Sequence, residues 1–172
     1  MPLDSRALTE LAQQVSPLQI ALATPDALEA LPTLEQTLQH VEDLSALLGS
    51  TARALRENLP GEGATPAQVR PAWLAQRALV ALAHATERAT WITDFTAYIS
   101  AFDLADSERA ARQDDVIGLQ YELGDELDQA MTHLRSGAKE LAARPAASAP
   151  GRVPPAPGRP TEPGGTAPAP RR

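Results

Sequence analysis

One continuous stretch, residues 65–102, constrains the fold of this chain more than any other. It holds every aromatic residue except Tyr121. Thr65 is suited to cap a helix, and Pro66 suits the first helical position, where a missing N–H costs nothing. Pro71 follows about one turn later and predicts a bend or a frayed first turn. The stretch therefore predicts one helix over 66–102.

Apolar residues of this helix follow two stripes at helical spacing. The first stripe is largely aromatic and consists of Trp73, Val80, His84, Trp91, Phe95, Tyr98 and Phe102. The second consists of Leu74, Ala78, Ala81, Leu82, Ala85, Ala89, Ile92 and Ile99. A helix with two apolar faces needs two neighbours, so we expect it in the middle of a bundle with a narrow polar edge. Its aromatic residues are then either packed core or the lining of a pocket.

Two further long helices are predicted, over 33–59 and 107–142. The first carries a heptad seam typical of a coiled coil, made of Leu34, Leu38, Val41, Ser45, Leu48, Ala52, Leu55 and Leu59. The second carries a seam made of Val116, Leu123, Leu127, Ala130, Leu134, Ala138 and Leu141. Short loops make successive helices antiparallel neighbours. Pairing the last two about their turn places Trp91 opposite Gly118 and Ala85 opposite Gly124, which predicts large residues packed against small ones.

The two ends of the chain differ from this pattern. Residues 1–31 are divided by Ser16-Pro17, Thr24-Pro25 and Pro32, so we expect short helical segments that cap a bundle formed by residues 32–144. Residues 145–172 hold one aliphatic side chain larger than alanine, Val153, and are expected to be a disordered, partly polyproline tail. The predicted fold is all-α: three long antiparallel helices completed by the N-terminal segments into a four-helix-like bundle.

Charge and composition exclude several classes of function. The net charge is −7, which argues against a primary role on nucleic acid or on an anionic membrane. It divides into 21 acidic against 11 basic residues up to position 144, and four arginines against one glutamate beyond it. No cysteine is present, the first 15 residues do not resemble a secretion signal, and no stretch is apolar enough to span a bilayer. We therefore expect a cytoplasmic protein, and the excess of arginine over lysine suggests a bacterial source.

Chemistry-bearing residues are few and scattered. One histidine falls on each long helix, namely His40, His84 and His133, but the Glu-x-x-His pattern of di-metal bundles is missing. Carboxylates are frequent after residue 113, as in Asp114-Asp115, and this spacing is typical of a solvated face. We predict no catalytic residue, metal or cofactor, and hence no enzyme.

Two short motifs remain. Tyr121-Glu-Leu-Gly-Asp125 resembles the Tyr-x-x-x-Asp/Glu signal of type VII secretion substrates, which are helical hairpins; the Trp-x-Gly turn of that family is missing here. The tail carries Pro154-x-x-Pro157 and Pro157-x-x-Pro160 near Arg152 and Arg159, a spacing that SH3-type modules bind. The alternative is a linker or a solubilising tail, because a segment this rich in proline contains such spacings by chance.

The pattern favours action by contact between helix surfaces. Leu44, Leu47 and Leu79 lie beside the predicted seams and are candidates for a surplus apolar surface. A protein partner or a second copy would cover that surface in an adaptor or a self-associating subunit. The alternative is a bundle that binds an apolar small molecule or effector between Trp91, Phe95 and Tyr98.

Overall fold

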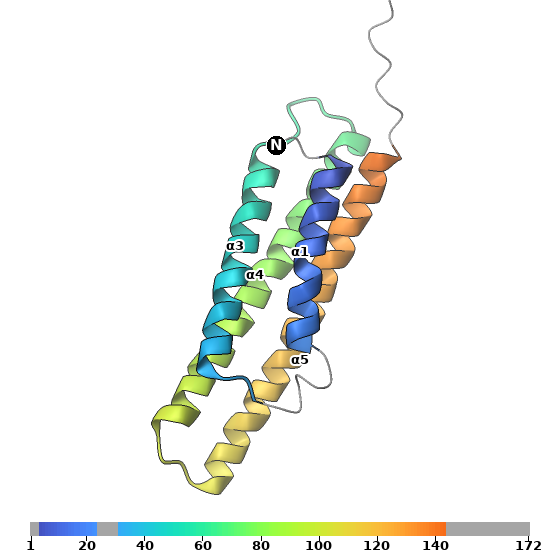
Figure 1. The fold of residues 1–172 in the computed structure, drawn as a ribbon. Coiled ribbons are helices and arrows are strands. Elements are labelled where there is room, and N and C mark those ends of the chain that lie inside the picture. The colour runs from blue at the N-terminus through green and yellow to red at the C-terminus, as the bar shows by residue number, and fades with distance from the viewer. Residues whose placement is uncertain (1–3, 24–30, 144–172) are drawn as a thin grey trace, which may run out of the picture.

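The chain forms an antiparallel bundle of helices in a computed structural model that describes residues 4–23 and 31–143. Those residues form α1 (Ser5–Ala23), α3 (Leu34–Arg56), α4 (Pro66–Ala101) and α5 (Asp106–Ala142), and include no strand. α4 packs on both α3 and α5, and α1 packs mainly on α5. In Figure 1 the connected ends of α4 and α5 project beyond α1 and α3. The predicted all-α bundle is thus confirmed; the predicted tail, residues 145–172, lies outside the described residues.

α1 is longer than the short segments expected at the N-terminus. It begins where the side chain of Asp4 accepts a hydrogen bond of 2.7 Å from the backbone N–H of Ala7. It then continues through Pro17, which the sequence analysis took as a break. Proline leaves the carbonyl of Gln13 without its helical donor, but both residues are exposed, so water can hydrate that carbonyl. Buried Val15 and Leu22 lie on either side of Pro17 and hold both halves on the core.

α3 turns a different face to the core from the one its leucines predict. Its buried residues are Thr37, Leu44, Leu47 and Thr51. Leu34, Leu38 and Leu59 of the predicted seam are exposed, and Val41, Leu48 and Leu55 are only partly buried. The predicted seven-residue spacing of the core positions on α3 is confirmed, but the wrong residues were assigned to those positions. The reason is that threonines occupy two of them. Their hydroxyls donate to the preceding turn, from Thr37 to Leu34 and from Thr51 to Leu47, each at 2.9 Å.

α4 and α5 pair in the register expected from their turn. Ion pairs join Arg70 to Glu140 at 2.7 Å and Arg88 to Glu122 at 2.7 Å. In both pairs the two residue numbers add up to 210, so any residue of α4 faces the residue of α5 whose number completes that sum. Trp91 therefore faces position 119, one residue from the predicted partner Gly118, and the predicted register is confirmed. Gly118 itself is exposed, with nothing within 4 Å of where a β-carbon would lie. The expectation that Gly118 makes room for a large core residue is wrong.

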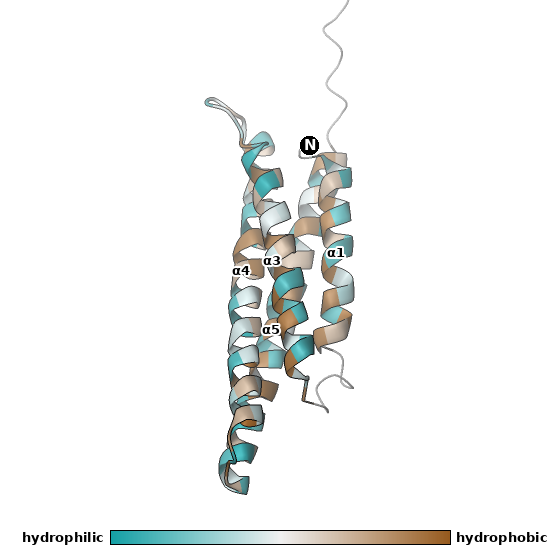
Figure 2. Cartoon of the chain, turned by 60° about the vertical axis from the view of Figure 1, so that its left-hand side comes forward, coloured by the Kyte–Doolittle hydropathy of each residue, from teal (hydrophilic) through white to brown (hydrophobic). Residues whose placement is uncertain are grey.

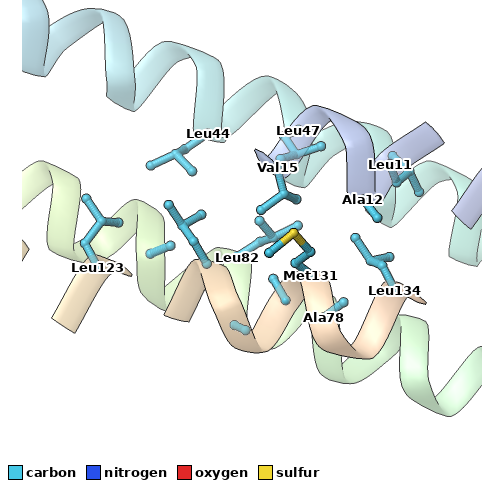
Figure 3. Packing of buried hydrophobic residues seen from close by; sticks show 14 of the residues in the cluster. Leu11, Ala12, Val15, Leu44, Leu47, Ala78, Leu82, Leu123, Met131 and Leu134 are labelled. Atoms are coloured by element: carbon cyan, nitrogen blue, oxygen red, sulfur yellow. The ribbon is translucent and has the colours of Figure 1, made fainter. Parts of the chain in front are cut away.

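The core lies where the four helices meet, and all four supply leucine or alanine to it. The second apolar stripe of α4 is buried there from Leu74 to Ile92, as predicted. Figure 3 labels ten members of this cluster: Leu11, Ala12, Val15, Leu44, Leu47, Ala78, Leu82, Leu123, Met131 and Leu134. No described helix has the length and apolarity needed to cross a lipid bilayer.

Candidate interaction surface

The aromatic stripe of α4 lies on the outside of the bundle. Its large exposed members, which we call the aromatic face, are Trp73, Val80, Trp91, Tyr98 and Phe102. Exposed fractions are 51% for Trp73, 48% for Trp91 and 56% for Phe102, so these residues are neither packed core nor the walls of an enclosed pocket. Phe95 alone among the aromatic residues of this helix packs against the core, and it is partly buried. The predicted two neighbours of α4 are confirmed, since it packs on α3 and α5. The prediction that its aromatic stripe is also covered is wrong within the described residues.

The lengths of the helices account for the far end of the aromatic face, Tyr98 and Phe102, but not for its other members. α4 spans 36 residues and α5 spans 37, whereas α3 spans 23 and α1 spans 19. The last turns of α4 consequently extend past the ends of the two shorter helices (Figure 1). Trp73 lies beside Leu74, at the level of Leu8 of α1, and is exposed because it is on the side of α4 away from the buried stripe. Figure 2 shows hydrophobic residues of α4 and α5 continuing into this projecting part.

Arg112 of α5 organises the aromatic residues of the projecting hairpin. Its guanidinium carbon lies 5.4 Å from the ring centroid of Phe95 and 5.7 Å from that of Tyr98. Both distances are within the range of cation–π attraction. Tyr98 also packs on Phe102 at 4.8 Å between ring centroids, and its hydroxyl donates to Glu108 at 3.3 Å. These contacts orient the rings while leaving Tyr98 and Phe102 open to solvent.

A shallow, open hollow of about 510 Å³ lies beside Arg112, between α4 and α5. We call it the α4–α5 hollow. Its lining combines apolar side chains, carboxylates, an arginine and a glycine: Trp91, Phe95, Leu119, Asp114, Asp115, Glu122, Arg88 and Gly118. The sequence analysis treated Asp114-Asp115 as a solvated acidic face and did not connect it with Trp91. The predicted pairing of α4 with α5 could have shown this connection, because it places residues 115, 119 and 122 of α5 opposite residues 95, 91 and 88 of α4.

Two of the three carboxylates in the hollow already contact arginines. Glu122 lies 2.7 Å from Arg88, and Asp115 lies 3.3 Å from Arg112. Their side chains nevertheless remain 59% and 49% exposed. Each can therefore accept another cationic donor without losing its present contact.

The aliphatic residues predicted as surplus surface lie elsewhere. Leu44 and Leu47 are buried in the core at 0% and 4% exposure, so the expectation that they form an exposed interaction surface is wrong. The physical reason is the phase error on α3, which placed core residues beside the seam. Leu79 is half-buried.

A second hollow lies between α1 and α3. Its volume is about 510 Å³, and its apolar lining includes Pro17, Leu18, Ala46 and Leu47. A small cavity of about 10 Å³ lies nearby between Leu22, Ile92 and Leu123. That volume is room for about one water molecule, which makes it too small for an organic ligand.

The three histidines lie in three different settings. His84 of α4 lies 3.4 Å from Glu126 of α5, across the helix pair. His40 of α3 lines the small cavity, and its burial lowers its pKa below the usual value, although Asp43 acts in the opposite direction. His133 is partly buried on α5. Among residues 4–23 and 31–143, no group of three or more His, Cys, Asp or Glu side chains is placed to hold a metal ion.

Tyr121 and Asp125, the ends of the secretion-like motif, are both exposed on α5. They lie one helical turn apart on the same side of the helix, well inside its span from Asp106 to Ala142. The motif is thus accessible, but it does not follow a helix end.

Comparison of the chain with known protein families, with curated protein sequences and with solved structures found no match.

Proposed function

We propose that this chain is a non-enzymatic interaction protein, an adaptor or a self-associating subunit, that binds its partner through the aromatic face of α4. The single observation that carries the proposal is the exposure of Trp73, Trp91 and Phe102 along one side of one helix. Aromatic side chains provide much of the binding energy of protein interfaces because they bury a large area. Leaving three of them in water costs solvation free energy that a partner surface would recover.

Position supports the same proposal. The aromatic face continues into a hairpin that extends past α1 and α3, where a partner can approach without colliding with the shorter helices. Arg112 holds the rings of Phe95 and Tyr98 in place, so little side-chain freedom would be lost on binding. Cytoplasmic localisation belongs to the same proposal, and fractionation of the host tests it.

The experiment compares charged variants on two sides of α4. Trp73→Glu combined with Phe102→Glu places a charge at each end of the aromatic face. Ala83→Glu combined with Thr90→Glu adds the same charge to the same helix at exposed positions off the face. Light scattering on the purified chain and affinity capture from the host are expected to show association in the wild type and in the control pair, and its loss in the first pair. Equal association of both pairs would contradict the proposal.

An alternative proposal is an apolar small-molecule or effector site in the α4–α5 hollow, favoured by its volume of about 510 Å³ and by the presence of Trp91 and Phe95. A ligand there should change the emission of Trp91 in a Trp73→Phe background. A further proposal is type VII-like secretion through exposed Tyr121 and Asp125. Export from the host that is unaffected by Tyr121→Ala would contradict it.

A further inference from the structure

We infer that the proline-rich tail of this chain docks in its own α4–α5 hollow, with the segment from Arg152 to Pro160 as the occupant. The inference does not depend on the proposed function, because docking within one chain can be measured in the absence of any partner. It requires three things: matching chemistry, matching charge and sufficient reach.

The lining of the hollow suits proline. Trp91 and Phe95 of α4 face Leu119 of α5 across a gap that Gly118 leaves open, since nothing lies within 4 Å of its absent β-carbon. Proline-rich segments bind to shallow grooves of this kind, where aromatic rings pack against the pyrrolidine rings. Little conformational entropy is lost on binding, because proline already restricts the free segment. The occupant offers Pro154, Pro155, Pro157 and Pro160 within seven residues.

Charge favours the same pairing. The chain up to residue 144 carries 21 acidic and 11 basic residues, and the part after it carries four arginines and one glutamate. Asp114, Asp115 and Glu122 surround the hollow, and the latter two are half-exposed beside their present arginine partners. Arg152 and Arg159 flank the prolines of the occupant. Carboxylates near aromatic rings provide the complement that an arginine-flanked proline segment requires.

The length of the tail matches the distance it must cover. The described part of the chain ends at Ala143, at the opposite end of the bundle from the hairpin turn (Figure 1). Gly118 lies 25 residues back along α5, which is about 37 Å at the rise of a helix. Pro155 lies 12 residues beyond Ala143, which is about 37 Å at the rise of a polyproline segment. A tail that runs back along α5 therefore brings its central prolines to the hollow.

The other two arginines of the tail lie well beyond the length that this match uses. Arg171 and Arg172 lie 28 and 29 residues beyond Ala143, more than twice as far along the tail as Pro155. The chain thus contains its own control: two pairs of arginines in one tail, of which the inference uses only the first.

A spin label provides the test. The chain has no cysteine, so Ala156→Cys creates a single labelling site in the full-length protein. Paramagnetic broadening is read at the backbone amide of Gly118 and the indole N–H of Trp91, with the indole of Trp73 as the internal reference. We expect loss of the first two signals and retention of the third.

Charge reversal then identifies the contact. Arg152→Glu with Arg159→Glu should restore the signals of Gly118 and Trp91, whereas Arg171→Glu with Arg172→Glu, which changes the net charge equally, should leave them broadened. Undiminished signals in the unreversed chain, or equal effects of the two reversals, would overturn the inference. A mixed sample detects docking between copies: one chain carries the spin label but no isotope, and the other carries the isotope but no spin label. Broadening of the same size in that mixture would overturn docking within one chain.

Discussion

Leu8 of α1 fills the space where Gly137 of α5 has no side chain. A β-carbon built on Gly137 would lie 2.9 Å from Cδ1 of Leu8 and 3.6 Å from the β-carbon of Leu74 on α4. Gly137 thus allows three helices to meet at one point, which explains a glycine in the interior of a helix despite its cost of about 1 kcal/mol relative to alanine. The sequence analysis assigned this role to Gly118, which is exposed.

The same substitution at these two glycines should therefore have opposite effects. Gly137→Leu is expected to destabilise the fold by about 1 to 3 kcal/mol, because α1 must move away from α5. Gly118→Leu should be neutral or stabilising, since the side chain meets open space and leucine favours the helix. Urea denaturation followed by circular dichroism measures both. A Gly118→Leu variant as unstable as Gly137→Leu would contradict the assignment.

The face that α3 turns to the core can be tested with two leucines of that helix. Leu44 is fully buried and Leu38 is 50% exposed. Leu44→Ala is expected to cost about 2 to 5 kcal/mol of unfolding free energy, as for other buried leucines. Leu38→Ala should stay within about 0.5 kcal/mol of the wild type. If Leu38→Ala were the more destabilising variant, α3 would turn its leucine seam to the core in place of Thr37, Leu44 and Thr51.

His40 predicts a pH dependence of stability. Burial lowers the pKa of His40, so the unfolded chain binds a proton at a higher pH than the folded chain. Stability is therefore expected to fall as the pH drops below the ordinary histidine pKa of about 6.5. His40→Gln removes the titrating group and should flatten the change in melting temperature between neutral and mildly acidic buffer. An unchanged slope in that variant would show that His40 is not the cause.

Arg112 should contribute to the order of the projecting hairpin more than to global stability. Arg112→Gln removes the cation beside Phe95 and Tyr98, where cation–π attraction at exposed sites is worth about 0.5 to 1 kcal/mol. We expect a small loss of stability together with faster amide hydrogen exchange at the ends of α4 and α5. Unchanged exchange in the hairpin would mean that the rings hold their places without Arg112.

Helix periodicity was sufficient to predict the bundle, because helices dominate the described chain. The turn near residue 104 was sufficient to predict the register of the two longest helices, α4 and α5. It failed on α3 because Thr37 and Thr51 occupy core positions, where each hydroxyl is satisfied by its own helix and only the methyl group meets the core. A reading based on large aliphatic residues assigns such positions to the surface. It also failed at Pro17, because Pro17 and Gln13, whose carbonyl a proline cannot bond, are both exposed residues.

The sequence predicted which residues form the candidate site but not that they are exposed to solvent. Trp91, Phe95 and Tyr98 were singled out from the sequence as core or pocket residues, and they line or adjoin a hollow that is open to solvent. Their exposure follows from the side of α4 on which they lie, because the buried residues of α4 belong to its other apolar stripe. Periodicity within one helix does not show which of two stripes its neighbours cover. The contribution of Asp114 and Asp115 required the pairing of α4 with α5, since nothing in their own stretch distinguishes them from a solvated acidic face.

The most direct test of the central claim is site-specific photo-cross-linking in the native host. A photoreactive phenylalanine analogue at position 102 or 73 lies on the aromatic face, and the same analogue at position 90 lies on α4 off the face. The account predicts a discrete cross-linked product, with a partner protein or with a second copy, from positions 102 and 73 and none from position 90. Absence of a product at 102 and 73, or an equal product at 90, would contradict the claim that this protein acts through the aromatic face.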